Sequence, residues 1–151
     1  MDFNFKEEMV YGKKHLDKLI IKNQYKFVEL VSQLFNCDLD ELHNSSQEKY
    51  ELFTEIGKDT QTIYHKLFYD KLNEGWNEIK DEYDNFIKNE ILPYLGLEEV
   101  LVQQFPTFRI QLPNNVAVVI NHYDSDMSHK HPKGEINFVY ALTDMYDTNT
   151  I

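Results

Sequence analysis

The spacing of the apolar residues changes near Gly96, and this change most constrains the fold. Before Gly96, apolar residues recur every three or four positions, which predicts amphipathic helices. After it, they alternate with polar residues or form β-branched runs, which predicts strands. Helices followed by strands indicate an α+β fold, and 151 residues suffice for one core. We therefore expect one folding unit, with a helical N-terminal region (residues 1–96) and a strand region (residues 97–151).

Three helical segments are expected in the N-terminal region. The first covers residues 15–36, where an apolar stripe keeps helical spacing. The second covers residues 45–57 and starts with a Ser-x-x-Glu capping box. Asp59 can cap the third, which continues to Pro93, and Gly75 is expected to weaken or divide it.

The strand region contains a predicted hairpin and one further strand. Residues 108–112 alternate between apolar and polar side chains, residues 113–115 read Pro-Asn-Asn, and residues 116–120 form a β-branched run. Residues 136–142 (INFVYAL) form the next strand signal. No internal repeat or low-complexity tract interrupts this order.

The charge of the chain limits its partners. Asp and Glu outnumber Lys and Arg by 26 to 15, which gives a formal net charge of -11. Because nucleic acids and anionic membranes bind clustered cations, we expect no nucleic-acid and no membrane partner.

Cysteine content and the N-terminal residues indicate the compartment. Cys37 is the sole cysteine, so an intrachain disulfide cannot form. The chain starts with mixed charges and lacks the long apolar run of a signal peptide or a membrane span. We therefore expect a cytoplasmic protein.

Residues 122–135 (HYDSDMSHKHPKGE) hold three of the six histidines and two patterns that suit a metal ion. In the first, His122-x-Asp124, residues two apart on an extended backbone point to the same side. One imidazole and one carboxylate can then share an ion. With a second histidine far along the chain, they would form the two-His-one-carboxylate triad of non-haem iron oxygenases.

The second pattern, His129-x-His131-x3-Glu135, resembles the first metal motif of the cupin family. Tyr123 and Leu142 stand where that motif expects glycines, which departs from the family pattern. A solvated polar loop that binds no metal is the third interpretation of this segment.

The residues around His122 carry a more specific resemblance. Their order and spacing resemble the streptomycin-biosynthesis StrG-like family, which is similar to iron(II)- and 2-oxoglutarate-dependent oxygenases of the phytanoyl-CoA-hydroxylase type. The resemblance covers about the last third of the chain. It is carried by residues 105–118 (FPTFRIQLPNNVAV), 122–124 (HYD), 131–138 (HPKGEINF), 142–144 (LTD) and 148–151 (TNTI).

This resemblance implies a fold, a cofactor and site residues. The fold would be a double-stranded β-helix, or jelly roll, whose first strands lie in residues 97–151. His122 and Asp124 would bind Fe(II), with 2-oxoglutarate as co-substrate and a small molecule, in secondary or sugar metabolism, as the substrate that is hydroxylated. Candidate cavity residues are Arg109, His131, Glu135 and Asn137.

Family members continue beyond the segment that matches Ile151, to a distal histidine and then an arginine that pairs with 2-oxoglutarate. The resemblance therefore implies a truncated chain with an incomplete barrel, without its third metal ligand, and with weak or no activity alone. Exposed strand edges would favour a homo-oligomer. Two alternatives stay open: a cupin-like metal protein using His129, His131 and Glu135, and a non-catalytic interaction module whose acidic helical region binds a partner.

Overall fold

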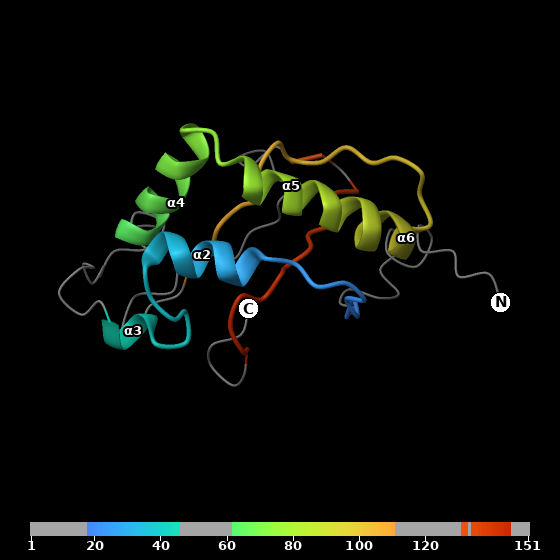
Figure 1. The fold of residues 1–151 in the computed structure, drawn as a ribbon. Helices are drawn as coiled ribbons and strands as arrows, with labels where there is room; N and C mark the ends of the chain where they lie inside the picture. Colours follow the sequence, from blue (N-terminus) through green and yellow to red (C-terminus); the bar gives the residue numbers. More distant parts are fainter. Residues whose placement is uncertain (1–17, 46–61, 111–130, 133, 146–151) are drawn as a thin grey trace.

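Helices form the regular structure of the part of the chain that the computed structural model describes, which is residues 18–45, 62–110, 131–132 and 134–145 (Figure 1). One of them is a single π-helical turn, η2, which continues α5 into α6. The elements, in chain order, are α2 (Phe27–Phe35), α3 (Leu42–Ser45), α4 (Ile63–Asn73), α5 (Asn77–Phe86), η2 (Ile87–Ile91) and α6 (Leu92–Leu95).

Helix α2 covers only the second half of the helix expected over residues 15–36. It buries Phe27 and Val31, which are four residues apart and therefore lie on one face. It ends at Asn36, whose left-handed φ of 52° lets the backbone N–H groups of Asn36 and Cys37 bond to the last turn. Residues 18–26 are not helical, so the predicted start is wrong.

Helix α4 begins at Thr62, whose hydroxyl accepts a hydrogen bond from the backbone N–H of His65 at 3.3 Å. The predicted cap, Asp59, lies outside the described residues. Gly75 has a φ of 95° and separates α4 from α5, so the predicted division of the long helix is confirmed. Ser45 ends α3 instead of starting a helix, and residues 46–57 lie outside the described part.

The helix extends beyond its predicted end at Pro93. Pro93 is the second residue of α6 and directly follows the π-helical turn η2, so the helix continues through it. The end is Gly96, whose φ is 64°. The N–H of Gly96 donates to the carbonyl of Pro93 and that of Leu97 to the carbonyl of Leu92, the pattern of a Schellman motif.

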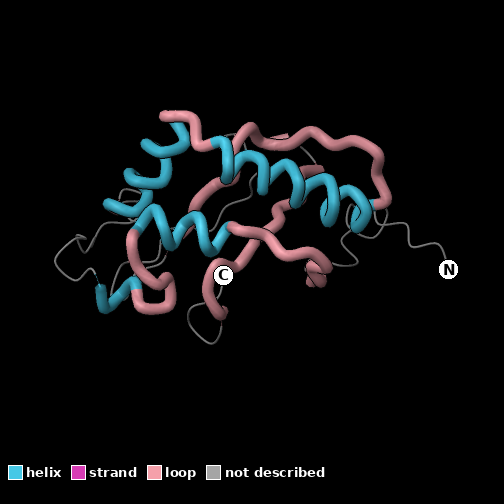
Figure 2. Tube along the Cα trace, viewed as in Figure 1, coloured by secondary structure: helices cyan, strands magenta, loops and turns pink. Residues whose placement is uncertain are grey.

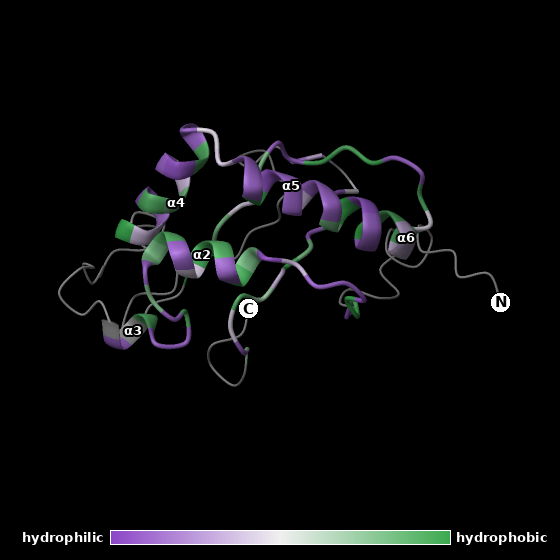
Figure 3. Cartoon of the chain, in the orientation of Figure 1, coloured by the Kyte–Doolittle hydropathy of each residue, from purple (hydrophilic) through white to green (hydrophobic). Residues whose placement is uncertain are grey.

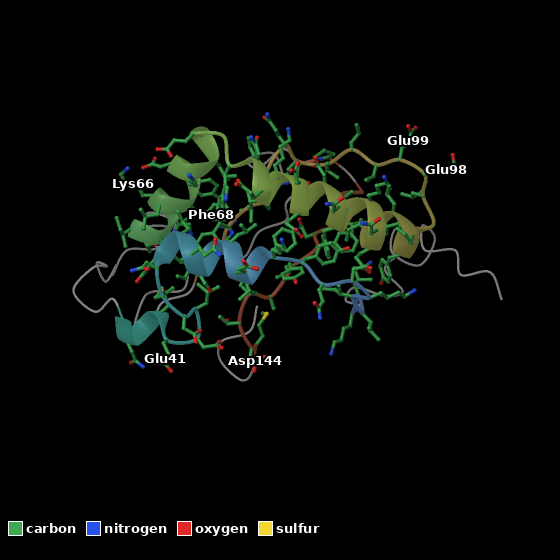
Figure 4. The ribbon with its side chains drawn as sticks, in the orientation of Figure 1. Glu41, Lys66, Phe68, Glu98, Glu99 and Asp144 are labelled. Carbon is green, nitrogen blue, oxygen red and sulfur yellow. The ribbon has the colours of Figure 1, made fainter. Side chains whose placement is uncertain are left out.

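The core joins α2, α4 and α5 to two later segments of the chain. Helix α2 packs against both α4 and α5. The ring of Phe108 stacks on that of Phe68 in α4, with centroids 4.6 Å apart, and the ring of Tyr140 lies 4.8 Å from that of Phe27 in α2. Figure 4 shows Phe68 inside the arrangement of helices. The segments after α6 are thus held by aromatic side chains.

The expected α+β fold with the first strands of a jelly roll is wrong for the described residues. None of them lies in a strand, and Figure 2 shows only helix and loop among them. Residues 136–142 do alternate: Phe138 and Tyr140 face the core, whereas Val139 is 64% exposed. Alternation determines which side chains an extended segment buries, but a sheet also needs a hydrogen-bonded neighbour. Residues 111–120, which carry most of the predicted hairpin, lie outside the described part.

The helices of the described part are too short, and not apolar enough, for any of them to cross a bilayer.

Candidate functional site

Two residues of the His-rich segment form a hydrogen-bonded pair. His131 Nδ1 lies 2.7 Å from Glu135 Oε2, and both side chains are partly exposed. A tight turn makes this contact: the backbone N–H of Glu135 donates to the carbonyl of Pro132 at 3.2 Å. Gly134 has a φ of 87°, a conformation that glycine adopts readily. The turn brings the chain back, so the carboxylate meets the imidazole.

This pair is chemically suited to hold one metal ligand in a fixed orientation. When the proton is on Nδ1 and donates to Glu135, Nε2 of His131 carries the lone pair. Histidines that bind metals commonly donate their other ring N–H to a carboxylate in this way. The pair therefore fits a metal-binding imidazole and its orienting group.

The structure brings together two of the three residues of the cupin-type pattern, His131 and Glu135. The third, His129, and the predicted iron ligands His122 and Asp124 lie outside the described residues. Within the described ranges, no group of three or more His, Cys, Asp or Glu side chains is placed to hold a metal ion.

Two predicted cavity residues are exposed. Arg109 follows the buried Phe108 and is itself exposed. Asn137 lies on the outer side of residues 136–142. Among the described side chains, the His131–Glu135 contact is thus the part of the predicted site with a defined geometry.

One buried carboxylate is not among the residues predicted from the sequence. Glu90, in η2, is only 4% exposed and accepts hydrogen bonds from the segment before α2. Its donors are the backbone N–H groups of Lys22 and Asn23, the side-chain amide of Asn23 at 2.6 Å and the Tyr25 hydroxyl at 3.1 Å. The sequence does carry a signal for this burial, because Glu90 follows Phe86 by four residues and so lies on the same apolar helix face.

Burial and hydrogen bonding act in opposite directions on Glu90. Burial raises the pKa of its carboxyl, but the bonds from Asn23, Lys22 and Tyr25 favour the charged form and leave the pKa lowered overall. The pKa of the Tyr25 hydroxyl is raised, mainly by burial and next by its hydrogen bond to Glu90. Glu90 therefore fixes residues 22–25 to η2 as an anion, which is a structural role.

A buried histidine also has a structural role. His65 is buried in α4, with Nδ1 2.8 Å from the Thr62 hydroxyl oxygen. Its ring packs against Phe108, with centroids 5.5 Å apart. This position connects the N-terminus of α4 to the segment that leads into the predicted site.

Comparison with known proteins gives a partial relationship. The chain is 32% identical over 93 residues to the streptomycin biosynthesis protein StrG of Streptomyces griseus, which is 62% of this chain and 43% of that protein. No family model matches the chain, and no solved structure matches it significantly. The alignment covers 93 residues, which is more than residues 97–151 contain. The similarity therefore extends into the helical region. The chain is thus similar to StrG over more than half of its own length, and it spans less than half of StrG.

Proposed function

We propose that this chain belongs to a metal-dependent oxygenase related to StrG, which hydroxylates a small molecule with Fe(II) and 2-oxoglutarate. The observation that carries the proposal is the 32% identity to StrG, taken with the His122-x-Asp124 pattern in the resembling residues. The name of StrG places that protein in streptomycin biosynthesis, so we propose a substrate from the biosynthesis of a sugar-containing secondary metabolite.

The chemistry of the two proposed ligands suits Fe(II). One imidazole and one carboxylate, contributed by His122 and Asp124, are ligands that Fe(II) accepts, and they leave coordination positions for other groups. Bound iron with 2-oxoglutarate would supply the oxidising chemistry, and the protein would bind and orient the reactants. We place this activity in the cytoplasm, where a lone cysteine stays reduced.

Anaerobic Fe(II) titration tests the ligand assignment. We expect His122→Ala and Asp124→Ala to weaken binding by about tenfold or more, because each removes one of few ligands. Asp126→Ala is the matched control, since it removes a carboxylate of the same segment without touching the pattern. Equal affinity of the Asp124→Ala and Asp126→Ala proteins would reject the assignment. Succinate release from 2-oxoglutarate tests the reaction itself.

A second candidate is a cupin-like metal protein that uses His129, His131 and Glu135. The observation in its favour is the 2.7 Å contact between His131 and Glu135, which brings two of the three proposed ligands together; in this candidate Glu135 would bind the ion itself instead of orienting His131. Here His129→Ala and Glu135→Gln would abolish metal binding, whereas Asp124→Ala would leave it unchanged. The two proposals thus predict opposite responses to Asp124→Ala and His129→Ala.

A further inference from the structure

The segment that follows α6 exposes an unusual number of apolar side chains. Leu101 is fully exposed, and Leu97, Val100 and Val102 are between 37% and 49% exposed. Single exposed apolar residues are ordinary, but four exposed apolar side chains within six positions are an unusual concentration along the chain. Figure 3 shows residues 100–102 as a hydrophobic stretch with hydrophilic residues on both sides.

This segment is fixed at both ends and open between them. The Leu97 N–H donates to the carbonyl of Leu92 at 3.0 Å, and the Gln103 carbonyl accepts from the Tyr83 hydroxyl at 3.3 Å. Between these anchors, the backbone of residues 98–102 makes no hydrogen bond to any other described residue. Figure 1 shows the segment running back along α5 from the end of α6, on the outside of the helices.

We propose that residues 98–104 pair with the same residues of a second copy of this chain, as two antiparallel strands with Leu101 facing Leu101. Antiparallel pairing would satisfy the N–H and C=O groups that have no partner among the described residues, and it would cover the apolar side chains. This inference does not depend on the proposed function.

The sequence of the segment complements itself in this register. Val100 lies opposite Val102, Glu99 opposite Gln103 and Glu98 opposite Gln104. Apolar residues therefore meet apolar residues, and each carboxylate faces an amide that can donate a hydrogen bond. Registers centred on Glu98 or Glu99 would place like charges opposite each other, which is unfavourable.

The acidic residues predict how the association depends on salt, and this dependence distinguishes a second copy of the chain from a basic partner. Glu98 and Glu99 point away from the helices, as Figure 4 shows, and the whole chain carries a net charge of -11. Two copies repel each other, so their association should strengthen when salt is raised from about 0.05 M to about 0.5 M, which shortens the screening length. A basic partner would show the opposite trend. Because so short a pairing buries less than a standard interface, we expect weak and reversible association.

Sedimentation equilibrium of the whole chain tests the pairing. We expect a monomer–dimer equilibrium that Leu101→Glu weakens by more than about tenfold, because two carboxylates then meet at the two-fold axis. Ile20→Glu is the matched control: it adds the same charge at a residue that is 75% exposed elsewhere, and should change the dissociation constant little. Mixing the Leu101→Glu and Leu101→Lys variants should restore a dimer. A strictly monomeric chain, or equal effects of Leu101→Glu and Ile20→Glu, would overturn the proposal.

Cysteine cross-linking tests the register, in a Cys37→Ser background that removes the native thiol. Residues directly opposite have Cβ atoms about 5 Å apart, so Leu101→Cys should form a disulfide-linked dimer under mild oxidation. In the same register, the two copies of residue 98 lie about 20 Å apart, so Glu98→Cys should cross-link poorly. Equal cross-linking at the two positions would overturn the register.

Discussion

The side-chain amide of Asn23 lies 2.6 Å from a carboxylate oxygen of Glu90, a residue 67 positions later in the chain. Together with bonds from the backbone of residues 22 and 23, this contact holds the segment before α2 against η2. The backbone N–H groups of Lys22 and Asn23 point to a carboxylate, which explains why these residues do not continue α2 toward the N-terminus.

We expect Glu90→Gln to lower the midpoint of thermal unfolding. A glutamine keeps one acceptor oxygen but turns an NH2 donor toward groups that are themselves donors, and it loses the charge that strengthens those bonds. The matched control is Glu82→Gln, because the partly exposed Glu82 side chain accepts, among the described residues, one bond, from the Lys26 N–H at 3.3 Å. Unfolding monitored by circular dichroism should show a large decrease for Glu90→Gln and a small one for Glu82→Gln. Equal decreases would contradict the anchoring role.

We expect the ionised Glu90 carboxylate to make the free energy of unfolding fall in acid. Its pKa in the folded chain lies below its ordinary value of 4.5, so it contributes stability above that value. The contribution disappears as the pH falls through the lowered pKa of the folded state. Urea unfolding of the wild type and of Glu90→Gln, measured from neutral pH downward, should therefore give stabilities that converge in acid. A difference that stays constant with pH would exclude ionised Glu90 as its source.

Phe108→Ala should destabilise the fold by about 3–5 kcal/mol, the usual cost of removing a buried aromatic ring. The ring is buried and stacks on Phe68 at 4.6 Å, and it also contacts Phe35 and His65. Val139→Ala serves as control: this side chain is 64% exposed, so the change should stay within about 0.5 kcal/mol. Denaturant unfolding measures both, and a Phe108→Ala cost as small as that of the control would show that the segment after α6 does not share the core.

Gly134→Ala should open the turn that joins His131 to Glu135. An added Cβ meets nothing within 4 Å, so the cost comes from the φ of 87° alone, about 1–3 kcal/mol for a residue with a side chain. Because the turn is local, we expect little change in global stability but an altered imidazole tautomer of His131, visible by nitrogen NMR. Glu135→Gln should alter the same resonances while leaving the turn intact. Unchanged His131 resonances in both variants would reject the contact.

Local patterns predicted the structure wherever the controlling interaction is local. The division of the long helix at Gly75 depends on the conformation of that residue and requires no knowledge of a distant partner. The prediction at Gly75 therefore succeeded in position. The strand predicted over residues 136–142 is wrong, although the extended backbone there does alternate buried and exposed side chains.

The failures share a non-local cause. The start of α2 depends on Glu90, a side chain far away in sequence, which no pattern within residues 15–36 reveals. The strands predicted within the described residues fail because alternation does not provide a neighbour with which to bond. In the candidate site, the spacing of His131 and Glu135 predicted two residues that can act together, and the turn through Gly134 explains how they meet.

The π-helical turn η2 has a consequence for the helix that follows it. A π-helical turn accommodates an extra residue, and each residue of an α-helix advances the side-chain direction by about 100°. The face of α6 is therefore out of phase with the face that an uninterrupted α5 would present. The extra residue lets Glu90 and Ile91 both point inward. A one-residue deletion within Ile87–Ile91 would restore α-helical phase and rotate α6, with the open segment beyond it, away from its present direction.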